Sequence, residues 1–161
     1  MARTQYWKYL RACPIHSKLN NRELMDFLEE VRPVERVCEK DVVIIGESDY
    51  DPTYSIVCRG RFRGEKYYYS GDVHLVRTYG EGEIINLACA VSRTKLSPVT
   101  VVASTNEAVL MTFRVDQVQN SKYYDRISEG FLEYLADVDI QSMEKINILS
   151  RSGIRTGCSC T

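Results

Sequence analysis

The chain has 161 residues, a length typical of one domain or of one domain with an appended helix. Apolar residues make up 44% and charged residues 27%, which excludes a wholly disordered or collagen-like chain. Lysine and arginine (21) nearly balance aspartate and glutamate (22), so the composition lacks the basic excess typical of a nucleic-acid-binding surface. No apolar run is long enough for a membrane helix, and the N-terminus lacks the apolar core of a secretory signal, so we expect a cytoplasmic protein.

The first 33 residues predict two helices. Apolar residues at helical spacing begin at Tyr6, and Pro14 ends this first helix. Asn20 followed by Glu23 has the pattern of a capping box, which predicts the start of the second helix. Pro33 ends that helix.

From residue 34 the apolar period changes to two, which is typical of strands. Seven short segments rich in Val, Ile, Thr and Tyr are separated by turn residues. The predicted strands are 34–38, 42–45, 53–58, 66–70, 72–79, 99–104 and 108–113. Many short strands with frequent turns predict an antiparallel sandwich or barrel. Segment 79–98 starts Gly-rich and turns apolar, and we expect it to hold a short helix between two strands.

Apolar side chains return to helical spacing after residue 120. The predicted helix runs from about 121 to 150, roughly 45 Å at 1.5 Å per residue. Its apolar residues follow the spacing of a coiled-coil seam, which predicts a parallel homodimer in which each helix covers the other. The predicted seam residues are Tyr124, Ile127, Phe131, Leu135, Val138, Met143, Ile146 and Leu149.

The cysteines and histidines do not form a recognisable metal-binding or catalytic pattern. Four cysteines stand singly among apolar neighbours, at Cys13, Cys38, Cys58 and Cys89. Because free cysteine behaves as a small hydrophobe, we expect these thiols to be buried. Cys158 and Cys160 lie in a polar tail without a nearby histidine. The only two histidines, His16 and His74, are far apart in the sequence, and we expect each to have a packing or surface role. Catalytic motifs such as GxSxG or HExxH are absent, so we expect no metal site and no enzyme.

A series of short motifs between residues 40 and 60 carries a family resemblance. The motifs are Lys40-Asp41, Ile44-Ile45, Glu47-Ser48-Asp49, Ile56-Val57 and Gly60. Together with the strand-rich region and the long helix, they resemble the cyclic-nucleotide-binding-like sensor domain of Crp/Fnr-type transcription regulators. Asp41 and Ser48 stand where the family has glycines, and they tolerate turns less easily.

The resemblance implies a mainly β fold with flanking helices. Its core is a double-stranded β-helix, or jelly-roll, barrel of the cyclic-nucleotide-binding type, followed by a long dimerisation helix. The implied organisation is a sensor barrel with N-terminal helices over 1–120, the dimerisation helix over 121–150, and a short tail over 151–161. The winged helix-turn-helix that follows in the family has no counterpart after Arg155, so we expect no specific DNA binding by this chain. A frameshift, a shortened chain and a stand-alone sensor are all open explanations.

In family members that bind cyclic nucleotides, the segment matching 79–98 is the phosphate-binding cassette. Backbone N–H groups and an arginine hold the cyclic phosphate, and a glutamate accepts from the ribose. Here Gly82-Glu83-Ile84-Ile85 matches the opening, whereas Asn86-Leu87-Ala88 replaces Gly-Glu-Leu and Ser97-Pro98-Val99 replaces the arginine motif. The resemblance implies a pocket at Gly82, Glu83, Ile84, Ile85, Asn86, Leu87, Ala88, Ser97, Pro98, Val99 and Thr100. Each lost charged hydrogen bond removes about 1.5–3 kcal/mol, so we expect cyclic AMP to bind weakly or not at all.

The preferred interpretation is an effector-sensing and dimerisation domain of a Crp/Fnr-type regulator. Its cassette is degenerate, its effector is an unknown small molecule, and no resident cofactor is expected. A genuine cyclic-nucleotide or other small-ligand-binding protein is one alternative, and a ligand-free dimerisation scaffold is another. Some relatives carry haem or an iron–sulfur cluster, and a cluster would require the dispersed cysteines to gather in the fold. Arg93 lies in the cassette loop, where an exposed arginine is the ordinary expectation.

Overall fold

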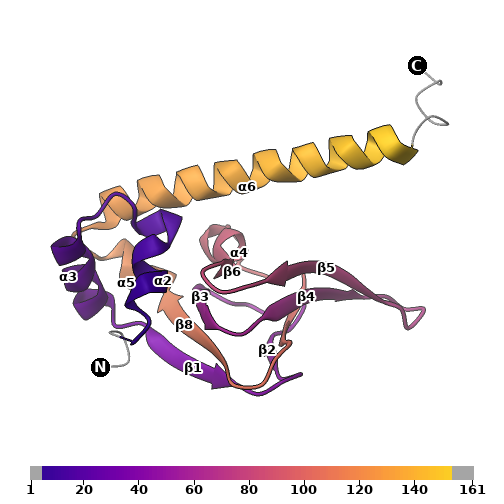
Figure 1. Ribbon diagram of the computed structural model, residues 1–161, viewed down its shortest axis with the longest axis horizontal. Coiled ribbons are helices and arrows are strands. Elements are labelled where there is room, and N and C mark those ends of the chain that lie inside the picture. The colour runs from indigo at the N-terminus through magenta and orange to yellow at the C-terminus, as the bar shows by residue number, and fades with distance from the viewer. Residues whose placement is uncertain (1–4, 154–161) are drawn as a thin grey trace.

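The computed structural model describes residues 5–153, with side chains described as far as residue 145. Among these residues, the helical segments that precede the first strand are α2 (Trp7–Ala12), η1 (Pro14–His16) and α3 (Asn21–Val31). The predicted capping box is confirmed, because the Glu23 N–H donates to Asn20 Oδ1 at 2.8 Å and the Asn20 N–H donates to Glu23 Oε1 at 3.0 Å. Both predicted N-terminal helices are therefore present (Figure 1).

Between residues 5 and 153, eight strands form two antiparallel sheets. The strands are β1 (Val34–Cys38), β2 (Val43–Ile45), β3 (Thr53–Arg59), β4 (Phe62–Tyr67), β5 (Val73–Tyr79), β6 (Ile84–Ile85), β7 (Thr100–Ala103) and β8 (Ala108–Arg114). One sheet has the order β1-β8-β3-β6 and the other the order β2-β7-β4-β5. The predicted antiparallel β architecture is confirmed, and six of the seven predicted strands lie within one residue of their observed ends.

The strand predicted at 66–70 is wrong. β4 instead covers Phe62–Tyr67, and the chain turns immediately afterwards, with the Gly71 N–H donating to the Tyr68 carbonyl at 2.9 Å. Tyr69 is fully exposed at the tip of the β4–β5 hairpin, so the tyrosine run has no common packing surface. High β propensity of tyrosine suggested a strand there, whereas the buried Phe62 that anchors β4 lies upstream.

The segment between β5 and β7 contains the expected short helix, α4 (Leu87–Val91), preceded by the two-residue strand β6. After β8 comes α5 (Val115–Gln119), which the sequence pattern did not predict. The chain then enters α6 (Tyr124–Gly153), which starts close to the predicted position. In Figure 1, α6 runs along one side of the barrel and extends toward the β4–β5 hairpin.

An aromatic cluster joins the barrel to the helices. The rings of Tyr54 and Phe113 stack with their centroids 5.0 Å apart. The ring of Phe27, from α3, also stacks with Phe113, with a centroid distance of 6.3 Å. Phe131 of α6 meets Tyr54 edge-on at 5.4 Å. Aromatic pairs of this kind add to the free energy that burial itself contributes. The cluster therefore fixes the first half of α6 to the barrel.

Part of the predicted dimer seam lies in the core of its own chain. Ile127 is fully buried and Phe131 is 5% exposed, both within the core of their own chain, so neither side chain is free to face a second copy. Tyr124 and Leu135 are partly buried against the same core. A helix packing on a barrel and a helix in a coiled coil require the same apolar spacing, which is why the pattern did not distinguish them. Met143 is exposed, and the side chains of Ile146 and Leu149 lie outside the described residues.

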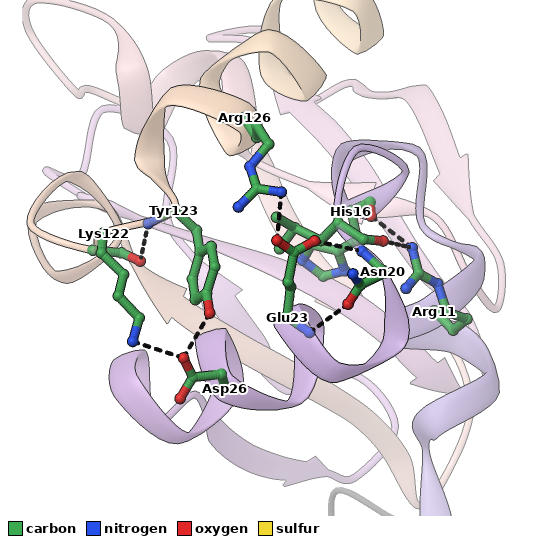
Figure 2. A network of polar contacts seen from close by, with 10 residues as sticks. Arg11, His16, Asn20, Glu23, Asp26, Lys122, Tyr123 and Arg126 are labelled. Atoms are coloured by element: carbon green, nitrogen blue, oxygen red, sulfur yellow. Dashed lines mark hydrogen bonds and ion pairs between the residues drawn. The ribbon is translucent and has the colours of Figure 1, made fainter.

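Polar contacts fasten the start of α6 to α3 (Figure 2). Arg126 Nη1 lies 2.6 Å from Glu23 Oε2, and the Tyr123 hydroxyl donates to Asp26 Oδ2 at 2.6 Å. Lys122 Nζ lies 2.8 Å from the same Asp26 oxygen. Hydrogen bonds from Lys122 and Tyr123 lower the pKa of Asp26. These residues hold both helices in one orientation.

The four dispersed cysteines are buried and free, which confirms the expectation for Cys13, Cys38, Cys58 and Cys89. Cys158 and Cys160 lie outside the described residues. His16 has a packing role: its ring is fully buried against Phe27 and Phe113, and Nδ1 lies 2.6 Å from the Leu10 carbonyl oxygen. Burial lowers the pKa of His16 to about 4.

Candidate ligand pocket

A cavity of about 140 Å³ lies between the barrel and α6. Its walls come from β5, from the β6–α4 segment, from the loop into β7 with the start of that strand, and from the middle of α6. The lining residues are Arg77, Tyr79, Ile84, Asn86, Leu87, Ala88, Cys89, Pro98, Val99, Val101, Tyr134, Leu135 and Val138. Most of these side chains are aliphatic or aromatic, and a few polar groups stand among them. Such a lining is typical of small-molecule sites.

Six of the residues expected in the pocket line this cavity: Ile84, Asn86, Leu87, Ala88, Pro98 and Val99. The other five have different surroundings. Ile85 belongs to the core between the sheets, and Gly82 takes a positive φ of 88° in the turn before β6. Ser97 is buried and donates to the Val99 carbonyl at 2.7 Å, while Thr100 Oγ1 accepts from the Glu47 N–H at 3.1 Å.

The fifth residue, Glu83, stands beside the cavity lining. Its Oε2 lies 3.6 Å from Nη2 of Arg77, and both side chains are partly exposed. Its Oε1 accepts from the Gly80 N–H at 2.9 Å. Glu83 is therefore tied to its own turn and to Arg77.

Arg77 is a lining residue that the motif pattern did not reveal. Its guanidinium lies 4.8 Å from the ring centroid of Tyr79, a cation–π contact that orients the charged group. Tyr134 of α6 also interacts with this guanidinium. Burial raises the pKa of both tyrosines, partly opposed by Arg77, so both hydroxyls keep their protons at neutral pH.

Three lining residues come from α6, and none of them was predicted as a pocket residue from the sequence. Leu135 and Val138 were predicted in the dimer seam, and both form part of the cavity wall. Tyr134 was not singled out at all. The sequence shows only that these three residues share the side of the helix that faces the barrel. That side is a pocket wall because residues of α4 and β5 line the same cavity.

Internal hydrogen bonds hold the cassette segment. Asn86 has a left-handed backbone, with φ of 71°, and its Nδ2 donates to the Thr53 carbonyl at 2.9 Å. The Ser92 hydroxyl donates to the Cys89 carbonyl at 2.7 Å. Arg93 is exposed and is not among the cavity-lining residues. The polar groups at Asn86 and Ser92 are thus used to position the segment on β3 and α4.

No three His, Cys, Asp or Glu side chains among the described residues gather where they could hold a metal ion. No helix within the described residues combines the length and the apolar character needed to cross a membrane.

Neither a protein-family model nor a curated protein matches this chain. Solved structures do match it. A cyclic nucleotide-binding domain from Methylobacillus flagellatus superposes with a TM-score of 0.75 at 14% identity, covering 89% of this chain and 84% of that one. The sensor domain of the transcriptional regulator DNR from Pseudomonas aeruginosa gives 0.68 at 14% identity, covering 90% and 95%.

The catabolite activator protein of Thermus thermophilus gives a TM-score of 0.71 at 17% identity, and the match covers 85% of this chain but only 63% of that protein. The chain thus spans less than two thirds of that relative. These neighbours confirm the predicted fold: a mainly β jelly-roll domain of the cyclic-nucleotide-binding type with a long C-terminal helix. One of them is the sensor domain of a transcriptional regulator, another is a catabolite activator protein and the third is a cyclic nucleotide-binding domain, in line with the resemblance to Crp/Fnr-type proteins.

Proposed function

We propose that this chain is an effector-sensing module in which a small molecule occupies the cavity between the barrel and α6. One observation carries the proposal: the cavity is lined by both parts, with Arg77 and Leu87 on the barrel side and Tyr134 and Val138 on α6. A molecule that contacts both parts binds more tightly to one arrangement of α6 than to others, and so shifts their populations.

We propose further that the effector is not a cyclic nucleotide. The cavity, at about 140 Å³, is smaller than the roughly 300–1,000 Å³ typical of sites for drug-sized ligands. The family's arginine motif is replaced by Ser97-Pro98-Val99, where no side chain is cationic. Asn86 stands in the segment that matches the family's ribose-binding motif, and its side-chain amide donates a hydrogen bond to the Thr53 carbonyl. A nucleotide would therefore meet too little space and too few charged partners.

We also propose a homodimer formed through α6, on a side of the helix that shares only Met143 with the described part of the predicted seam. Leu132, Ile140 and Met143 are 71%, 53% and 61% exposed, and with exposed Ala136 their spacing of 4, 4 and 3 places them on one side of the helix. Leu132 follows the buried Phe131, so this side is rotated by about 100° from the barrel-facing side. A matching stripe on a second copy would cover these side chains.

The test of the sensor proposal is a ligand screen by thermal unfolding of the full chain, followed by calorimetry. The panel contains cyclic AMP, cyclic GMP, haem and small metabolites. Val138→Phe narrows the cavity, and Asp137→Phe adds the same ring at an exposed neighbouring position as the control. We expect a metabolite to raise Tm in the parent chain and in Asp137→Phe, with the rise abolished in Val138→Phe.

Two outcomes would contradict the proposal in different ways. If no compound in a broad panel raises Tm, the domain is a scaffold without an effector. If calorimetry gives a micromolar or tighter Kd for cyclic AMP, the cassette is functional and the chain is a genuine cyclic-nucleotide-binding protein. The two results separate the alternatives that the sequence left open.

A further inference from the structure

We infer that the effector is a small monocarboxylate whose apolar body is about the size of one benzene ring, and that Arg77 binds its carboxylate. The inference rests on the proposed function, because it assigns a ligand class to the same cavity. Size, wall chemistry and charge lead to it independently of one another.

The cavity has the size of a single small ring. An apolar cavity of about 150 Å³ in another protein stays dry and binds benzene, and the present cavity measures about 140 Å³. Its walls include Ile84, Leu87, Val101 and Leu135, which offer only carbon atoms to a ligand. An apolar body gains free energy by leaving water for such walls, whereas a sugar would lose hydrogen bonds there.

Arg77 supplies the charge complement. It is the one cationic side chain among the lining residues, and a guanidinium offers several N–H donors in a planar fork that matches a carboxylate. Its contact with Glu83 measures 3.6 Å, longer than the roughly 2.7–2.9 Å of a charge-assisted hydrogen bond. The guanidinium therefore has donor capacity for a ligand, and the Tyr79 ring holds it in place from one face.

The same group of side chains limits the ligand to one negative charge. A dianion such as a phosphate monoester would bring its second charge toward Glu83, and the lining provides no second cation to offset the repulsion. Burial raises the pKa of the Cys89 thiol, so this lining residue stays neutral and adds no anion of its own. A monoanion satisfies Arg77 without this conflict.

The position of Tyr134 links the bound anion to the helix. Tyr134 comes from α6 and interacts with Arg77 of β5, and its protonated hydroxyl is a hydrogen-bond donor. A carboxylate accepting from both residues would connect α6 to the barrel. Binding of the monocarboxylate is thereby coupled to the position of α6.

The experiment measures binding of sodium benzoate and of neutral benzamide to the full chain by calorimetry. Benzamide has nearly the same shape and lacks the charge. Arg77→Met removes the guanidinium, Arg77→Lys keeps a positive charge, and Arg93→Met is the matched control at an exposed arginine of the cassette loop. We expect benzoate to bind about 10- to 100-fold more tightly than benzamide, and Arg77→Met to lose that preference. Arg77→Lys should keep part of it and Arg93→Met all of it.

The outcomes separate the inference from the proposed function. Equal binding of benzoate and benzamide, or unchanged benzoate binding by Arg77→Met, would refute the anion site while leaving the cavity a neutral-ligand sensor. Benzoate binding that Val138→Phe does not weaken would show that the acid binds elsewhere, and would also overturn the inference. If neither benzoate nor benzamide binds, the monocarboxylate inference is also overturned. The ligand panel then decides whether the sensor proposal stands. The unfolding temperature of each arginine variant verifies that it is folded.

Discussion

A methyl group on Gly130 would lie 2.5 Å from the carbonyl oxygen of Ile15 and 2.8 Å from its Cα. The backbone of α6 therefore crosses the backbone of the η1 segment with no side chain between them. This crossing sets how closely α6 approaches the barrel. Because Tyr134 and Val138 follow on the same helix and line the candidate pocket, we expect the crossing also to affect the width of that pocket.

The first prediction is that Gly130→Ala destabilises the protein. In an open helix this substitution stabilises by about 1 kcal/mol, because alanine has the higher helix propensity. Here the added methyl group meets backbone atoms that cannot rotate away, so we expect a loss of about 1–3 kcal/mol in the free energy of unfolding. Urea unfolding measures it, with Glu129→Ala at the exposed preceding position as a control that changes stability by about 0.5 kcal/mol or less. A stabilised Gly130→Ala variant would contradict the close crossing.

The second prediction concerns the pH dependence of stability and His16. Burial lowers the pKa of His16 from 6.5 to about 4, and Nε2 has no hydrogen-bond partner among the described residues. Below pH 6.5 the unfolded chain takes up a proton that the folded chain does not, so stability falls as pH falls. The contribution of His16 is fully present above pH 6.5 and is lost by about pH 4, a change of roughly 3 kcal/mol.

Two asparagine variants isolate this contribution from that of the carboxylates. His16→Asn retains an N–H that can donate to the Leu10 carbonyl but does not titrate. Urea unfolding between pH 7 and pH 4 should show a shallower loss of stability for His16→Asn than for the parent chain. His74→Asn, at the exposed second histidine, should follow the parent. Parallel curves for the parent and His16→Asn would mean that His16 takes up its proton as readily in the folded state as in the unfolded chain, and would contradict the lowered pKa.

The third prediction is that Ser48→Gly stabilises the protein. Ser48 adopts φ of 70°, a left-handed backbone that costs a residue with a Cβ atom roughly 1–2 kcal/mol. Its N–H donates to the Ser97 carbonyl at 2.7 Å, a bond that glycine keeps. Because glycine loses more entropy on folding, we expect a net gain of about 0.5–1 kcal/mol, measured as a rise in Tm. Asp49→Gly, at the adjacent position without a positive φ, should instead destabilise, since Asp49 Oδ2 accepts from the Gly46 N–H at 3.0 Å.

Local rules in the sequence were sufficient for much of the fold. The capping box at Asn20 and the alternation of the strands depend on neighbouring residues, and they predict correctly. The two replaced glycines are informative as well, because Asp41 and Ser48 take φ of 69° and 70°, as glycine positions would. The two turns therefore keep a left-handed backbone even though the glycines that normally permit it are replaced.

The sequence did not predict which surface covers the apolar side of α6 or where the pocket finds its cation. Phe131 has the spacing of a coiled-coil residue, yet it packs on Tyr54, from a strand far away in the chain. Arg77 lies in β5, which is an edge strand of its sheet. Tyr134 lines the same cavity as Arg77 because α6 packs on the barrel there. Both features depend on contacts between distant segments, which periodicity does not encode.

The fourth prediction separates the core side of α6 from its proposed dimer side. Phe131→Glu places a charge in the aromatic cluster, so we expect it to lower the free energy of unfolding by more than about 3 kcal/mol. Ile140→Glu replaces a half-exposed side chain and should leave the fold intact while converting the dimer to a monomer. Sedimentation equilibrium of Ile140→Glu, beside Asp137→Ala as an exposed control on another side of the helix, measures the effect. A dimer that persists in Ile140→Glu would exclude the Leu132–Met143 stripe as the interface, and a parent chain that sediments as a monomer would exclude the dimer itself.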